Sequence, residues 1–312
     1  MKIENMKTNF ISLLAIAVLA GCSGNEENPA IDNGHLVPIE LNVGVNVLSR
    51  APIASNDKIT NIGIAGWEAE EDKVNYAVKY TWHSHLSATA STTAQNVKWT
   101  VQQYYNADEN IYTYMKAWYP CGDFQTSPIK DNKVTFSNDG TVDVMMANIV
   151  HGSKIHKEGA SLRFSHMTSQ IKFNVKKGTG LTEGTKIERI VIKNAQFPIG
   201  FDISKDYSDP TAITYSEKAD LSVPHINNNQ EIGDEAQAGA PVMIRPTGSN
   251  TFTIDVKTSE TTYTNCTVKL TGGINMEKGY AYTITLTFGH AGLELTATVE
   301  EWKTAAGSAD LQ

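Results

Sequence analysis

The sequence has few cysteines and no cluster of basic residues. Only Cys22, Cys121 and Cys266 occur in 312 residues, without the CxxC or Cys/His spacing of a zinc site. Lys and Arg number 26 against 34 Asp and Glu, which gives a net charge of −8. The scattered basic residues make nucleic acid a poor partner. Because Cys121 and Cys266 lie far apart in the sequence, we expect them to stay unpaired.

Motifs of the common enzyme classes are also absent. The chain contains no GxSxG, no HExxH, no P-loop and no dinucleotide-binding fingerprint. His83 and His85 share one face of an extended segment, but no third metal ligand lies near them in the sequence. We expect His166 to be structural rather than a catalytic base. We therefore predict no catalytic residues, no metal and no cofactor.

The only long apolar run is residues 10–20, which is too short to span a bilayer as a helix. It follows Lys2 and Lys7 and ends in Leu-Ala-Gly before Cys22, which resembles the lipobox of bacterial lipoproteins. We expect residues 1–21 to be a signal peptide and Cys22 to carry the lipid, an ordinary secretory signal being the alternative. Residues 22–35 are polar and are predicted to be a tether, in which Glu26 and Glu27 resemble the export signal of surface lipoproteins.

Helical periodicity is almost absent from the rest of the chain. Short runs of alternating apolar and polar residues recur instead, separated by Gly, Asn and Asp turns, which is typical of antiparallel sandwiches. Strands are expected at 74–82 and 111–119, among others, and a loop at 86–94. A polar stretch at 147–159 is predicted to separate two β-sandwich domains in tandem, residues 36–158 and 159–312, with 162–164 beginning the second.

The clearest strand signal lies in residues 37–51. Alternate positions are apolar and therefore point to one face of an extended chain. They are Val37, Ile39, Leu41, Val43, Val45 and Val47. One strand cannot bury such a row alone, so we expect it to fill a groove formed by other strands. The pattern stops at Arg50 and Ala51, where we expect an exposed loop.

Several short patterns occur in an order that resembles the fimbrillin-like pilus subunits of Bacteroides-type bacteria. Together they span most of the chain after the signal peptide, although residues 195–240 match nothing. They are the lipobox at Cys22, the strand ending in Arg50-Ala51, the aromatic strand 112–120, and the segments 141–147, 162–166, 171–175 and 278–302.

The resemblance implies two transthyretin-like β-sandwich domains and a mode of assembly. Such subunits are exported as lipoproteins to the outer membrane and exposed on the cell surface. An Arg-specific protease then removes the first strand, which places the cut between Arg50 and Ala51 here. A strand of another pilin subunit fills the open groove, so the subunits join head to tail into a fimbria.

A second apolar row lies near the C-terminus, at Leu293, Leu295, Ala297 and Val299. It is either a donor strand for a neighbouring subunit or simply the last strand of the second sandwich. The tail after it is short and lacks an apolar row, which also fits a tip or accessory subunit. The alternative function is a surface adhesin or glycan-binding lipoprotein that does not polymerise. Its receptor would lie on a host or bacterial surface and would contact an aromatic-rich first domain.

Overall fold

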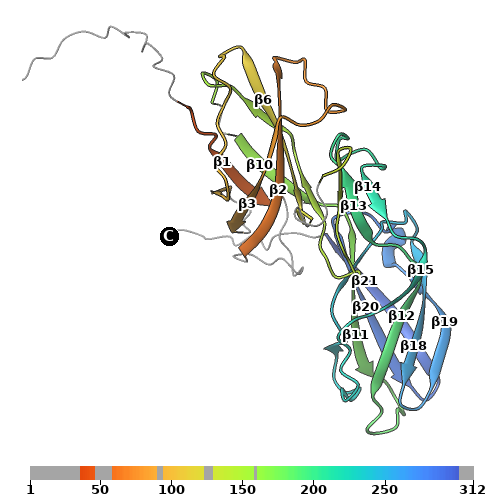
Figure 1. The fold of residues 1–312 in the computed structure, drawn as a ribbon. Helices are drawn as coiled ribbons and strands as arrows, with labels where there is room; N and C mark the ends of the chain where they lie inside the picture. The colour runs from red at the N-terminus through yellow and green to blue at the C-terminus, as the bar shows by residue number, and fades with distance from the viewer. Residues whose placement is uncertain (1–35, 46–57, 90–93, 123–128, 158–159, 302–312) are drawn as a thin grey trace, which may run out of the picture. The chain divides into compact units, whose positions relative to one another are not determined.

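The computed structural model describes residues 36–45, 58–89, 94–122, 129–157 and 160–301. Within these residues the fold is all-β, as predicted, and the only other regular element is a 3-10 turn at Thr271–Gly273. The strands form four sheets in the described part of the chain (Figure 1).

The largest sheet is built from the first half of the chain. Its strands are β1 Leu41–Val45, β2 Lys58–Glu70, β3 Trp82–Thr89, β4 Gln95–Asn96, β5 Lys98–Trp99, β6 Ile111–Tyr119, β8 Met145–Ala147, β9 Val150–Gly152 and β10 Ala160–His166. Their spatial order is β4-β1-β10-β8-β6-β2-β3-β5, and β9 pairs with β6. Val43 on β1 and Leu86 on β3 lie in the same buried cluster, so this sheet curls around one core, which we call the first core.

The second half of the chain forms two sheets that face each other. One contains β12 Ile187–Ala195, β15 Ala219–Ser222, β18 Thr251–Thr258 and β19 Thr262–Lys269, and the other contains β11 Ser169–Lys177, β16 Ala236–Gln237, β17 Val242–Ile244, β20 Tyr280–Gly289 and β21 Gly292–Glu301. Ile190 and Val256 from the four-stranded sheet share a core with Phe173 and Ile284 from the five-stranded sheet. Alternation of apolar and polar residues along these strands buries one face of each sheet, which produces a sandwich.

A small third layer joins the two halves. It consists of β7 Lys133–Thr135, β13 Pro198–Asp202 and β14 Ile213–Tyr215, so a strand from the first half pairs with strands from the second. Trp118 on β6 and Phe201 on β13 lie in one buried cluster, whereas Ala117 faces the first core. Successive residues of β6 therefore point into different cores, which explains why both faces of this strand carry bulky residues.

Lys116 on β6 is a buried cation, with 5% of its surface exposed. Its Nζ donates to the backbone oxygens of Ile203 (3.2 Å), Ser204 (3.4 Å) and Lys205 (3.1 Å), and lies 3.6 Å from the centroid of the Tyr76 ring. These contacts tie β6 to the segment that follows β13. They also provide the hydrogen bonds that a buried ammonium requires.

Two expectations about individual strands are wrong. Residues 74–81 contain no strand, because the side chain of Asn75 accepts a hydrogen bond from the backbone N–H of Ala77 and holds a turn there. β3 begins at Trp82 instead and continues to Thr89, so it includes part of the loop expected at 86–94. The side chains of Val74, Tyr76 and Tyr80 pack against the buried cluster that contains Trp118 and Phe201, although these residues form no strand.

The strand expected to begin the second domain belongs to the first sheet. β10 pairs with β1 and β8, and Leu162 and Phe164 lie in the first core. Two pairings, β1 with β10 and β11 with β20, are parallel among otherwise antiparallel partners. Parallel neighbours need a long connection between them, and the chain between these strands is long enough. The division into residues 36–158 and 159–312 stays a prediction.

No helix in the described ranges is long and apolar enough to cross a membrane.

Candidate functional site: the groove around the first strand

The apolar row of the first strand is buried as far as it can be followed. Ile39, Leu41, Val43 and Val45 are between 0% and 3% exposed and belong to the first core, and Val37 is half-buried against it. Val47 lies outside the described residues. The opposite face of the strand carries the exposed Glu40 and half-buried Asn42.

One wall of the groove is β10, which runs parallel to β1 from Leu41↔Ala160 to Val45↔Phe164 (Figure 1). Leu162 and Phe164 on β10 are 0% and 1% exposed and face the same core as the row on β1. Two adjacent strands thus contribute apolar side chains to the same core.

The other wall is formed by residues 95–105, which we call the clasp. Asn96 and Gln95 pair antiparallel with Asn42 and Val43. The N–H of Ile39 donates to the carbonyl of Gln103 at 2.9 Å, and the N–H of Tyr105 donates to the carbonyl of Val37 at 2.9 Å.

A side chain of the clasp adds another bond. Gln102 Nε2 donates to the carbonyl of Ile39 at 3.0 Å. Both edges of the first strand therefore have hydrogen-bonding partners, so its removal would leave unpaired backbone groups along two walls.

A polar cavity of about 180 Å³ lies beside the outer face of the strand. Glu40, Asn42, Asn96, Tyr105 and Lys157 are among the residues around it. Burial, with the charge of Glu40 second, raises the pKa of Tyr105 above its ordinary value. The first strand is thus packed in apolar surroundings on one face and polar surroundings on the other.

The predicted processing residues lie outside the described part of the chain. Cys22 falls in residues 1–35, and Arg50 and Ala51 fall in residues 46–57, between the end of β1 and the start of β2. The lipid attachment and the cut therefore stay predictions.

The C-terminal row lies on β21, which pairs antiparallel with β20 from Tyr280↔Glu301 to Gly289↔Gly292. Ala297 is 2% exposed, while Leu293, Leu295 and Val299 are half-buried against the core between the two facing sheets. In this structure the row belongs to the last strand of the chain's own sandwich. A role as donor to another subunit would require it to leave β20.

Four residues considered for chemistry or cross-linking lie outside the groove. Asp143 and His166 form a buried pair, with His166 Nδ1 2.9 Å from Asp143 Oδ2. Cys121 is buried and Cys266 is partly exposed on β19, and no disulfide joins them. Within the described residues, no group of three or more His, Cys, Asp or Glu side chains is arranged to hold a metal ion.

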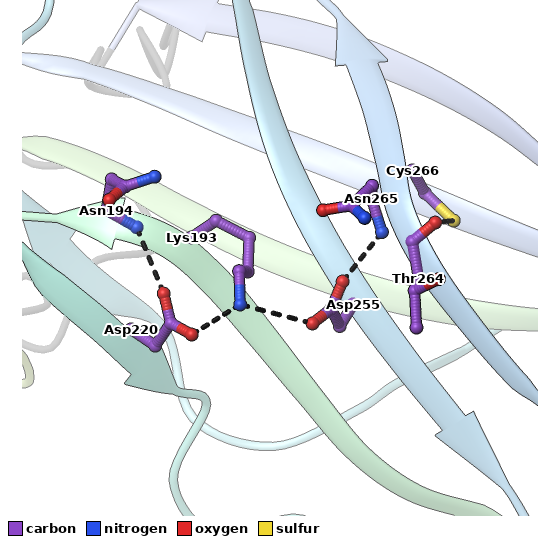
Figure 2. A network of polar contacts seen from close by, with 7 residues as sticks. All are labelled: Lys193, Asn194, Asp220, Asp255, Thr264, Asn265 and Cys266. Atoms are coloured by element: carbon purple, nitrogen blue, oxygen red, sulfur yellow. Dashed lines mark hydrogen bonds and ion pairs between the residues drawn. The ribbon is translucent and has the colours of Figure 1, made fainter.

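Figure 2 shows a charged network on the outer face of the four-stranded sheet. Lys193 on β12 contacts Asp220 and lies 3.3 Å from Asp255 on β18, whose carboxylate also accepts from the N–H of Asn265 at 2.7 Å. The hydrogen bond between Lys193 and Asp220 raises the pKa of Lys193 and lowers that of Asp220. Both groups stay charged, so the amine has no lone pair for nucleophilic attack, and the network serves to link neighbouring strands.

Sequence reasoning missed the clasp. Apolar and polar residues alternate at 97–101, but the bonds to β1 come mostly from the backbone of residues outside that run. Gln102 and Gln103 are polar residues without a motif, so no local signal pointed to them. These residues bond to the first strand only because the folded chain brings residues 95–105 alongside β1.

The fimbrillin-like family matches residues 49–302, most of the chain. The chain belongs to the fimbrillin-like family. No curated protein matches it.

Two solved structures share the fold of this fimbrillin-like chain. A candidate cell adhesion protein from Bacteroides uniformis is 17% identical, with a TM-score of 0.55 over 85% of this chain and 99% of the other. A candidate cell adhesion protein from Bacteroides ovatus is also 17% identical, with a TM-score of 0.55 over 86% of this chain and 99% of the other. Membership of the family makes the chain a fimbrial or adhesion subunit of the cell surface, rather than a member of an enzyme family.

Proposed function

We propose that this protein is a structural, tip or accessory subunit of a surface fimbria that accepts a strand from another subunit. Its precursor is exported to the outer membrane as a lipoprotein with the lipid on Cys22. An Arg-specific protease cuts between Arg50 and Ala51 and releases the first strand. The observation that carries this proposal is the burial of the row from Ile39 to Val45 in a groove with two hydrogen-bonding walls.

Energetics make the emptied groove a strong acceptor. Full burial of one aliphatic side chain stabilises by about 1.5–3 kcal/mol. The row from Ile39 to Val45 contains four such side chains, which together give about 8 kcal/mol before the entropy of ordering the strand is subtracted. A donor strand with the same alternation recovers most of this energy and the ladder hydrogen bonds. Because donor and acceptor surfaces differ, the contact is head-to-tail and builds an open filament.

Limited proteolysis tests the proposal. A chain that begins after the signal peptide is treated with a low dose of trypsin, and the new N-terminus is read by mass spectrometry. We expect Ala51 as the first residue, and we expect an Arg50→Gln chain to resist cleavage there. The cut chain should then exchange its first strand for a labelled peptide of residues 37–47. Absence of the cut at Arg50, or of peptide uptake by the cut chain, would contradict the proposal.

A second function is favoured by a different feature of the first sheet. Glu71, Tyr112, His151 and His156 surround a cavity of about 290 Å³. His156 stacks on Tyr112 with centroids 5.9 Å apart, and His151 stacks on Tyr114 at 5.2 Å. Exposed histidine rings beside a carboxylate suit a sugar, so a non-polymerising, glycan-binding adhesin remains the alternative. By contrast, Trp67 and Trp118 are 2% and 1% exposed and belong to a core.

A glycan array distinguishes this alternative. If the protein is such an adhesin, it should bind at least one glycan, and His151→Ala or His156→Ala should weaken that binding about tenfold or more. Both histidines are exposed, so these changes should leave the fold intact. Lys98→Ala, on β5, is the control because Lys98 is also exposed but does not border this cavity. Binding that is absent, or equal in all variants, removes the alternative.

A further inference from the structure

Gly44 interrupts the polar face of the first strand and is buried there. It lies opposite Arg163 on β10, between Val43 and Val45 of the apolar row. A Cβ atom built on Gly44 would lie 2.9 Å from Arg163 Nη1, 3.4 Å from Ala94 Cα and 3.5 Å from Ala94 N. A glycine inside a strand weakens it, and its presence often marks a site where another group approaches the backbone closely.

The two neighbours of this position differ in how far they can move. The Arg163 guanidinium ends a flexible side chain and can retreat by a few tenths of an ångström, whereas Ala94 contributes backbone atoms and directly precedes Gln95, which pairs with Val43. A methyl group therefore fits after a small adjustment. A branched side chain would meet Arg163 on one side and Ala94 on the other, which is overpacking. We call this position the gate.

We propose that the gate selects the donor strand, which must carry glycine, or at most alanine, between the two inward-facing residues that replace Val43 and Val45. This inference rests on the proposed function, because it concerns the strand that replaces β1. The occupant is a strand of a different subunit, with alternating apolar residues and a small residue at the gate. A second copy of this chain does not supply it through β21.

The sequence of β21 shows the mismatch. Leu293, Leu295, Ala297 and Val299 have the spacing of Ile39, Leu41, Val43 and Val45. In that register Thr298 lies at the gate. The residues between members of this row are Glu294, Thr296 and Thr298, none of which is glycine or alanine. If β21 entered the groove two residues out of this register, or in the opposite direction, one of these three side chains would still lie at the gate as long as the gate falls within the row.

Exchange of labelled peptides tests this selection in the full-length chain after cleavage at Arg50. The peptides are residues 37–47, the same peptide with Gly44→Ala or Gly44→Thr, and residues 292–301 with and without Thr298→Gly. We expect the Gly44→Thr peptide to be taken up about tenfold more weakly than the native peptide, with the alanine peptide between them. Thr298→Gly should improve uptake of the C-terminal peptide by a similar factor.

The acceptor variant Arg163→Ala tests the atom that forms the gate. It should recover most of the uptake of the Gly44→Thr peptide relative to that of the native peptide, and an unchanged circular dichroism spectrum shows that the variant is folded. Equal uptake of native and threonine peptides, no recovery in Arg163→Ala, or native-like uptake of residues 292–301 would overturn the inference and leave the groove intact. Failure of the native peptide itself would instead contradict the proposed function.

Discussion

Replacing Val43 with aspartate is expected to lower the free energy of unfolding by about 4 kcal/mol. Val43 is 0% exposed in the first core, among Leu41, Leu162 and Phe164. A carboxylate at this position would have to leave water or bind a proton, and either change costs free energy. The strand stays covalently attached in this variant, so the measurement reports packing in the groove and not assembly.

The matched control is Glu40→Ser on the same strand. Glu40 is exposed and faces away from the first core, so this change should alter the free energy of unfolding by less than about 0.5 kcal/mol. Urea denaturation followed by tryptophan fluorescence measures both variants. Similar small effects at the two positions would show that the row does not fill the groove, and the assembly proposal would lose its basis.

Replacing Lys116 with methionine is expected to destabilise the chain by about 2 kcal/mol at neutral pH. Methionine keeps most of the apolar stem but leaves the carbonyls of Ile203, Ser204 and Lys205 without the ammonium that donates to them. Lys116→Ala also removes the stem and creates a cavity, so we expect a loss of about 4 kcal/mol. The difference between the variants separates packing from hydrogen bonding.

Lys116→Met should also change the pH dependence of the free energy of unfolding. Burial lowers the pKa of Lys116 to about 8 from its usual 10.5, although the charges of Asp206 and Asp202 oppose this shift. The unfolded chain therefore holds the proton more tightly than the folded chain. Stability contributed by this group rises between pH 8 and pH 10.5, and Lys116→Met should lack that rise.

Lys79→Met is the control for these measurements. Lys79 is exposed and lies 5.9 Å from the centroid of the Tyr80 ring, so it also has a cation–π contact, but one in solvent. Its replacement should change stability by less than about 1 kcal/mol and should leave the pH profile between pH 8 and pH 10.5 as in the unmodified chain. Parallel pH profiles for Lys116→Met and the unmodified chain would show that Lys116 does not titrate as a buried amine.

Much of the fold was predictable because alternation is a local property. The rows on β1, β6 and β21 were each recognised, and the all-β architecture followed from the recurrence of such alternation. The prediction failed at residues 74–81, where alternating apolar side chains pack against a buried cluster although the backbone forms turns. It also failed at β10, because position along the chain does not reveal which sheet a strand joins.

The candidate site was predictable only in part. The row from Ile39 to Val45 and its burial followed from the sequence, since an extended chain must place alternate side chains on one face. The clasp and the gate did not, because they depend on residues 94–105 and Arg163 lying next to β1. No pattern within those segments encodes this proximity.

The sequence by itself determined which side chains of the first strand point inward, because that choice depends only on residue parity. Only the tertiary structure decided what flanks the strand: β10 in parallel on one side, the clasp on the other, and Arg163 opposite Gly44. The physical reason is that pairing partners are selected by the packing of the whole core, which brings together residues more than a hundred positions apart in the chain.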